Sequence, residues 1–190
     1  MASLRGGLDG ARNALLLGRP TDPAAVEACT DLLAHDDPAR LHVLSVLFTS
    51  RPDKRRAEWE HHVGPLPAGF EVLSSQKPSA RAEDLDVRLV SGPGNFTDVG
   101  VAITEMLSEW PDDASGSLCL HSATALLQHA TTDQVYQFLY TLCDHLAEAG
   151  VQGHVHLNPG AHDEKTVDTF KTLFDAVVEV GEEETRVRTR

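Results

Sequence analysis

Residues 14–25 read Ala-Leu-Leu-Leu-Gly-Arg-Pro-Thr-Asp-Pro-Ala-Ala, and this stretch decides how the chain folds. The apolar run Leu15–Leu17 is typical of a buried strand, and it ends at Gly18. Asp22 and Pro23 then supply the N-cap and the first-turn proline of a helix. A strand, a glycine turn and a helix in this order form the frame of a phosphate-binding P-loop.

The residues that give a P-loop its chemistry are missing from this frame. A working P-loop has the pattern G-x-x-x-x-G-K-[ST], and counted from Gly18 the second glycine position holds Pro23. The lysine position holds Ala24 and the Ser/Thr position holds Ala25. No ammonium group therefore remains for the β- and γ-phosphates and no hydroxyl for Mg²⁺. Asp22 adds a negative charge where a phosphate would lie.

The composition predicts one globular domain over residues 1–190, with a core of about residues 12–180 and a charged tail over 182–190. Net charge is −13, from 29 Asp and Glu against 16 Lys and Arg. This excess of carboxylates favours a halophilic source with a salt-rich cytoplasm, because salt weakens self-repulsion. The alternative is an acidic soluble protein from a high-GC genome. Either way nucleic acid is a poor partner, since binding to it depends on basic contacts.

The cysteines and the apolar runs indicate a reducing, non-membrane setting. Cys29, Cys119 and Cys143 each have apolar neighbours, and Cys29 belongs to the apolar stripe of the helix that starts at Pro23. We expect buried free thiols, as in a cytosolic protein. No signal peptide is recognisable, and the apolar runs are far shorter than the ~20 residues that span a bilayer. We therefore expect a cytoplasmic protein with no membrane partner.

Strand and helix signals alternate along the chain, which predicts an open, mostly parallel sheet with helices on both faces. The tail Glu182–Arg190 is expected to form an edge strand or to fray, and Ser74–Asp84 a mobile loop. The predicted strands are Asn13–Gly18, Leu41–Phe48, Phe70–Leu73, Val87–Val90, Ser117–His121, Val151–Leu157 and Ala176–Val180. The predicted helices start at Pro23, span Pro52–Val63, run from a Thr97 cap to Pro111, run from a Thr131 or Thr132 cap to Gly150, and span Asp163–Phe174.

The positions of a nucleotide-hydrolysing site are also changed elsewhere. An apolar strand that ends in Asp would hold Mg²⁺, but Ser117–His121 ends in His121, a poor ligand for this hard cation. No Glu follows the strand Leu41–Phe48, where a catalytic carboxylate would lie. Ser122 is adjacent to His121, and adjacent strand residues face opposite ways, so the two form no Ser–His dyad.

The order of motifs carries a family resemblance. The P-loop-like strand is followed by Ser122-Ala-Thr-Ala-Leu-Leu-Gln, by His154-Val-His156-Leu-Asn158-Pro159-Gly-Ala-His162-Asp163 and by Thr172-Leu-Phe-Asp175-Ala-Val-Val-Glu-Val. Over about residues 12–180 the chain resembles the KaiC-like branch of the RecA superfamily, and most closely a haloarchaeal family of small proteins with a degenerate P-loop. The resemblance implies a RecA-like three-layer α/β/α sandwich with a mostly parallel central sheet.

Members of the wider family bind ATP, form rings and act in timekeeping, motility and signalling. This chain departs from them at the positions that support ATP binding, Pro23, Ala24, Ala25 and His121. The resemblance thus implies the fold, while these residues predict a pseudo-ATPase without cofactor or catalytic residues. Its vestigial nucleotide pocket would consist of Gly18, Thr21, Asp22, His121, Ser122 and Asn158.

The histidines near this pocket leave several interpretations open. His154 and His156 lie on one strand face, and a RecA-type strand order places their strand between those of Gly18 and His121. His121, His156 and Asn158 would then gather at the carboxyl ends of adjacent strands, where open α/β sheets bind ligands. They either bond locally and fill the old phosphate cavity, line a redirected small-ligand or nucleotide pocket, or belong to a metal site. The candidate metal ligands are His154, His156 and His162.

Two functional hypotheses follow. The first is a non-catalytic signalling or regulatory module that binds a protein partner or a second copy of itself. Its expected contact region is the charged helix Pro52–Val63 with the loop Ser74–Asp84, where Arg51, Arg55 and Arg56 would be exposed. The second is a ligand- or metal-binding sensor or enzyme that uses a rebuilt pocket at the strand ends.

Overall fold

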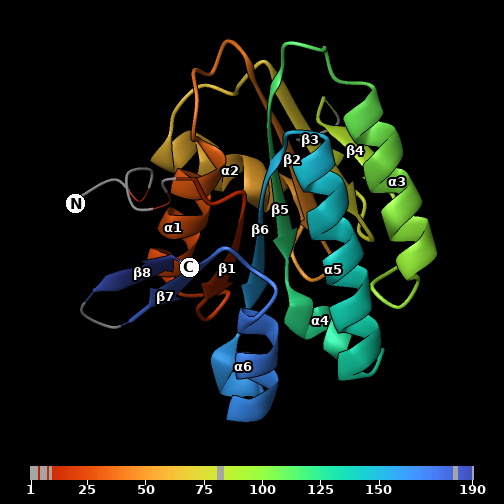
Figure 1. Cartoon of the computed structure of the whole chain (residues 1–190). Coiled ribbons are helices and arrows are strands. Elements are labelled where there is room, and N and C mark those ends of the chain that lie inside the picture. Colours follow the sequence, from red (N-terminus) through yellow and green to blue (C-terminus); the bar gives the residue numbers. More distant parts are fainter. Residues whose placement is uncertain (1–3, 5–7, 9, 81–83, 182–183, 190) are drawn as a thin grey trace.

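The computed structural model describes residues 4, 8, 10–80, 84–181 and 184–189, and within them one mixed sheet forms the centre of the molecule (Figure 1). Its strand order is β4-β3-β2-β5-β6-β1-β7-β8. Every neighbouring pair is parallel except β7 and β8. The strands are β1 (Asn13–Leu17), β2 (Leu41–Leu47), β3 (Gly69–Ser74), β4 (Asp86–Leu89), β5 (Ser115–His121), β6 (Gln152–Leu157), β7 (Ala176–Val180) and β8 (Thr185–Thr189).

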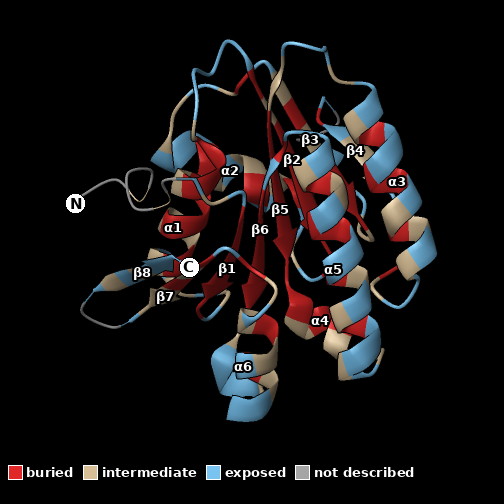
Figure 2. Ribbon diagram, in the orientation of Figure 1, coloured by how far each residue is buried: buried red, intermediate tan, exposed pale blue. Residues whose placement is uncertain are grey.

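Helices cover both faces of the sheet, so the predicted α/β/α layers are confirmed (Figure 1). The first face is covered by α1 (Pro23–Leu33) and α2 (Pro52–His62). The other is covered by α3 (Phe96–Ser108), α4 (Ala123–Leu127), α5 (Thr132–Glu148) and α6 (Glu164–Lys171). Alternation along the strands divides the core between the two faces, because Leu15 and Leu17 pack on the second and Leu16 on the first. Figure 2 shows the buried strands between these helix layers.

The helix starts follow the capping chemistry of the sequence. The Asp22 side chain caps α1, Thr131 forms a capping box at α5, and Asp163 caps α6, as predicted. The prediction for α3 was wrong, since its N-cap is Asn95 and the Asn95 side chain accepts from Asp98 N. Thr97 lies inside the first turn of this helix.

Helix α2 differs from the surface helix that its charge predicts. Trp59 is fully buried, and Arg55 is only 1% exposed. The two residues are four apart and so lie on the same side of the helix, which packs against the sheet and α1. Arg55 is therefore not available to a partner, contrary to its predicted role.

The C-terminal segment forms an edge strand, which is one of the two predicted alternatives. β8 pairs antiparallel with β7, with Val178 opposite Val187, and forms one edge of the sheet. Glu182, Glu183 and Arg190 of the predicted tail lie outside the described residues, as do residues 81–83 of the predicted loop. Among the helices described, none is long and apolar enough to cross a bilayer.

Candidate functional site

The structure brings the predicted pocket residues to one edge of the sheet. β5, β6 and β1 are neighbours, so their carboxyl ends lie side by side, as the RecA-type order predicts. The turns that follow these three strands carry Gly18, Thr21, Asp22, Ser122 and Asn158, and His121 is the last residue of β5.

The turn between β1 and α1 uses its own backbone amides. Asp22 Oδ1 accepts from Ala24 N at 3.0 Å, and the Asp22 carbonyl accepts from Ala25 N at 3.0 Å and from Val26 N at 3.1 Å. Pro23, the first helical residue, has no N–H. The amides that would meet an anion at a helix N-terminus are thus already bonded inside the turn.

This turn also lies directly against its helix. A Cβ atom added to Gly18 would come within 3.1 Å of Ala25 Cβ, and Ala25 is buried. The Gly18 amide donates to the Leu157 carbonyl at 3.2 Å, which ties the turn to the end of β6.

The turn after β5 is held by a network around α4. Ser122 caps α4 by accepting from Ala125 N, and its φ of 120° is the only positive φ of a non-glycine residue in the described chain. Thr124 Oγ1 accepts from Asn158 N at 3.1 Å and lies 3.0 Å from His162 Nε2. His162, one of the candidate metal ligands, is thus bonded to α4 and is not among the four residues whose ligand atoms lie close together.

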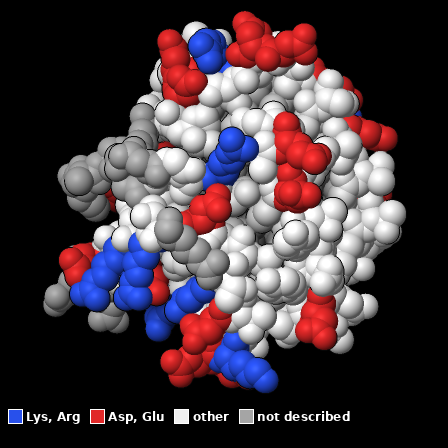
Figure 3. Space-filling view, in the orientation of Figure 1, with Lys and Arg blue, Asp and Glu red and all other residues white. Residues whose placement is uncertain are grey.

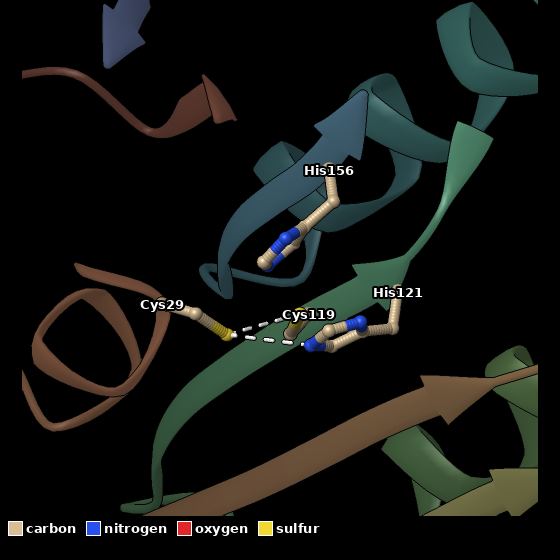
Figure 4. Close-up of side chains that lie close together, drawn as sticks. All are labelled: Cys29, Cys119, His121 and His156. Atoms are coloured by element: carbon tan, nitrogen blue, oxygen red, sulfur yellow. Dashed lines mark hydrogen bonds between the residues drawn. The ribbon is translucent and has the colours of Figure 1, made fainter. Parts of the chain in front are cut away.

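Below this edge, Cys and His side chains form a compact cluster on the α1 face of the sheet. Cys119 and His121 are two residues apart on β5, and His154 and His156 are two residues apart on β6, so each pair lies on one face of the sheet. The parallel register places Cys119 beside His154. Cys29 lies on α1, which packs over these strand residues. Figure 4 shows Cys29, Cys119, His121 and His156 pointing toward one another.

The contacts within the cluster are short. Cys29 Sγ lies 3.5 Å from Cys119 Sγ, 4.0 Å from His121 Nε2 and 3.2 Å from His154 Nε2. The rings of His121 and His156 stack with their centroids 4.1 Å apart. One ligand atom from each of Cys29, Cys119, His121 and His156 can be chosen so that all four lie within 4.8 Å of one another.

The pKa values of the two thiols in the cluster are shifted in opposite directions. Burial alone would raise the pKa of Cys29, but the hydrogen bond with Cys119 and the positive charge of Arg55 hold it well below its usual value. Burial and the same hydrogen bond raise the pKa of Cys119 well above its usual value. The two thiols therefore differ in acidity, and Cys29 is the one that the charge of the buried Arg55 favours as thiolate.

His156 is neutral at physiological pH. Burial, followed by the charge of His121, lowers the pKa of His156 to about 3. Its Nε2 atom is buried and has no hydrogen-bond partner. A neutral imidazole with an unused ring nitrogen is the form that binds metal ions.

Sequence reasoning predicted His121 and His156 but missed Cys29, Cys119 and Arg55 as members of this site. Cys119-x-His121 and His154-x-His156 are alternating pairs on strands predicted to be neighbours, and that signal places four polar residues on one face. Cys29 was predicted only as a buried stripe residue. Its meeting with Cys119 depends on how α1 packs on the sheet.

Comparison with known proteins places the chain in a family. The family model described as "Family of unknown function (DUF7504)" matches residues 11–180. The chain belongs to this family. No curated protein matches the sequence.

Among solved structures, the chain is similar to the crystal structure of the KaiC-like protein PH0186 from the hyperthermophilic archaeon Pyrococcus horikoshii OT3. The TM-score is 0.58 at 13% sequence identity, and the match covers 94% of this chain and 79% of that one. The KaiC/RecA-like fold expected from the sequence is therefore confirmed. At this identity the likeness concerns the fold alone.

Proposed function

We propose that this protein is a non-catalytic KaiC/RecA-like domain that acts through protein contacts and does not turn over nucleotide. The observation that carries the proposal is the turn between β1 and α1. Asp22 accepts hydrogen bonds from the backbone amides of Ala24, Ala25 and Val26, at the helix start where a P-loop would bind phosphate. No lysine or Ser/Thr hydroxyl stands at the motif positions to supply the remaining contacts.

The test is a direct measurement of nucleotide binding. Calorimetric titration of the purified protein with Mg·ATP and Mg·GTP should show no binding with a dissociation constant in the micromolar range. The rate of phosphate release should not exceed the rate in buffer without protein. Binding in the micromolar range would contradict the proposal. So would Mg²⁺-dependent turnover that is lost in Thr21→Ala or His121→Ala.

The groove between α3 and α5 supports a contact surface on the face opposite the Cys/His cluster. Its volume is about 770 Å³, and its lining includes Phe96 of α3, whose ring stacks on that of Phe138 of α5 with the centroids 4.9 Å apart. Val101 at its rim is 51% exposed. Among the described lining residues Asp133 is the only Asp, Glu, Lys or Arg. Figure 3 shows an uncharged area over the middle of these helices, with Asp and Glu around it, whereas Lys and Arg gather near β8 and α6.

We assign this surface to a second copy of the chain. Two molecules that each carry a net charge of −13 repel one another, so they approach most easily through the face with the fewest charges. The arginines near α2 are less suited to a contact, because Arg55 is buried, and Arg51 and Arg56 are paired with carboxylates. A salt-rich cytoplasm, which screens the repulsion, belongs to the same proposal.

Sedimentation velocity at rising protein concentration in molar KCl tests this assignment. We expect a monomer–dimer equilibrium that Val101→Glu shifts to monomer. Leu89→Glu is the matched control, because Leu89 is 48% exposed on β4 and outside the groove. A wild-type protein that stays monomeric at all concentrations would overturn the assignment, as would equal effects of the two variants.

A further inference from the structure

We propose that Cys29, Cys119, His121 and His156 form a closed, four-coordinate site for one zinc-class divalent transition-metal ion. The site lies between α1 and the sheet, on the face opposite the α3–α5 groove. It does not depend on the proposed function, because neither nucleotide nor a second copy of the chain takes part in it.

The spacing of the ligand atoms fits such a site. Zinc binds thiolate sulfur at about 2.3 Å and imidazole nitrogen at about 2.0–2.1 Å, so tetrahedral ligand atoms lie roughly 3.3–3.8 Å apart. The Cys29 and Cys119 sulfur atoms are 3.5 Å apart, and Cys29 Sγ is 4.0 Å from His121 Nε2. All four donor atoms lie within 4.8 Å of one another, so small side-chain rotations bring them to one centre.

One polar atom of the cluster, His156 Nε2, lacks a hydrogen-bond partner among the described residues. Cys29 and Cys119 belong to the apolar core under α1 and α2, and His121 and His156 are buried beside them. The unpaired His156 Nε2 is unusual, because buried polar atoms are almost always paired. A bound metal ion would use this nitrogen and so removes the cost of leaving it unpaired.

The charges also balance when a divalent ion is bound. Two thiolates and one divalent cation give a neutral centre, and Arg55 is neutralised by Glu58, whose Oε2 is 3.0 Å from Arg55 Nη1. Arg55 Nε and Nη2 lack partners among the described residues. Thiolate sulfurs are acceptors for such donors, so Arg55 suits the outer shell of a dithiolate site.

The donor set selects the class of metal. Thiolate with imidazole favours zinc and similar borderline-soft ions, whereas Mg²⁺ and Ca²⁺ need oxygen ligands. Four protein ligands leave no open position for substrate, which is the arrangement of structural zinc sites. His154, 3.2 Å from Cys29 Sγ, is a positioning residue next to the ligands.

Cobalt binding tests the site in the intact wild-type protein. The protein is stripped with a chelator, kept reduced and titrated with Co²⁺. The visible absorption of Co²⁺ reports tetrahedral geometry, and its near-ultraviolet bands report thiolate ligation. We expect one equivalent to bind with both signals and to be displaced by one equivalent of Zn²⁺. Zn²⁺ should also raise the melting temperature, and a chelator should reverse the rise.

Variants then assign the ligands. Cys29→Ser and His156→Gln should lose the tetrahedral cobalt spectrum, while His154→Gln should keep it with affinity weakened about 10–100-fold. Cys143→Ser is the matched control, because Cys143 is a buried free thiol on the opposite face of the sheet. It should bind Co²⁺ like the wild type.

Two results would overturn the proposal without any variant. One is a reduced wild-type protein that binds no Co²⁺ at micromolar concentration. The other is Co²⁺ binding without thiolate bands, which would place the ion away from Cys29 and Cys119. Loss of the spectrum in Cys143→Ser together with an unchanged spectrum in Cys29→Ser would also overturn it. None of these results bears on nucleotide binding, so failure here is distinguishable from failure of the proposed function.

Discussion

Arg55 and Glu58 form an ion pair beneath the surface of α2, with Arg55 Nη1 3.0 Å from Glu58 Oε2. The Arg55 side chain is 1% exposed and that of Glu58 is 15% exposed. The charges of the Cys29 and Cys119 thiols and of this carboxylate all raise the pKa of Arg55. Arg55 is therefore part of the protein interior, although the charged sequence of α2 predicts a solvent-exposed helix.

Removing Arg55 should destabilise the protein strongly. Arg55→Ala removes the buried partner of Glu58 and leaves this carboxylate with the more distant Lys54, whose Nζ is 3.7 Å from Glu58 Oε1, so we expect a loss of about 3–5 kcal/mol in the free energy of unfolding by urea. Arg51→Ala is the control, because Arg51 pairs with Asp53 at the surface and should cost at most about 1 kcal/mol. Equal effects of the two changes would contradict the burial of Arg55.

The N-cap of α1 should contribute measurably to stability. Asp22→Ala removes the bond from Ala24 N to Asp22 Oδ1, and the expected loss is about 1 kcal/mol in the free energy of unfolding. Thr21→Ala, one residue earlier at an exposed position, should change it little. A cap variant as stable as Thr21→Ala would show that another group satisfies the helix start.

Glu71 should make the protein less stable as pH rises. Burial raises the pKa of Glu71, although the hydrogen bond from Trp110 Nε1 opposes the shift. Because the pKa of Glu71 is higher in the folded state than in the unfolded state, the free energy of unfolding falls as pH rises through the folded-state pKa. Glu71→Gln keeps an acceptor for Trp110, so it should be more stable than the wild type at pH 7.

The pH dependence of this difference provides the check. Urea unfolding at pH 7 and at pH 4 should show the advantage of Glu71→Gln shrinking at pH 4, where the carboxyl group is largely protonated in both states. A wild-type protein that is the more stable of the two at pH 7 would mean that the Trp110 bond to the carboxylate outweighs burial.

Salt should stabilise the folded protein. Net charge is −13 and the chain has four lysines, Lys54, Lys77, Lys165 and Lys171, so self-repulsion opposes folding until it is screened. Melting curves in a KCl series should show the transition temperature rising well beyond the concentrations of ordinary screening. A transition temperature that stays constant from low to molar KCl would contradict both this expectation and the proposed salt-rich cytoplasm.

Much of the fold could be predicted from local sequence. The apolar runs of β1, β2, β5 and β6 and the caps at Asp22, Thr131 and Asp163 are short-range features, and the structure confirms them. The cap of α3 was missed because Asn95 and Thr97 are both good capping residues two positions apart. Local chemistry alone does not choose between them.

The sequence by itself determined the alternation of strands and helices, and the strand order implied by its family resemblance predicted the meeting of His121 with His156. Only the tertiary structure decided that Cys29 reaches Cys119, that Arg55 faces inward and that His162 bonds to Thr124. These contacts depend on how a helix or loop lies over the sheet. That placement follows from packing over many residues distant in sequence, which no local pattern records.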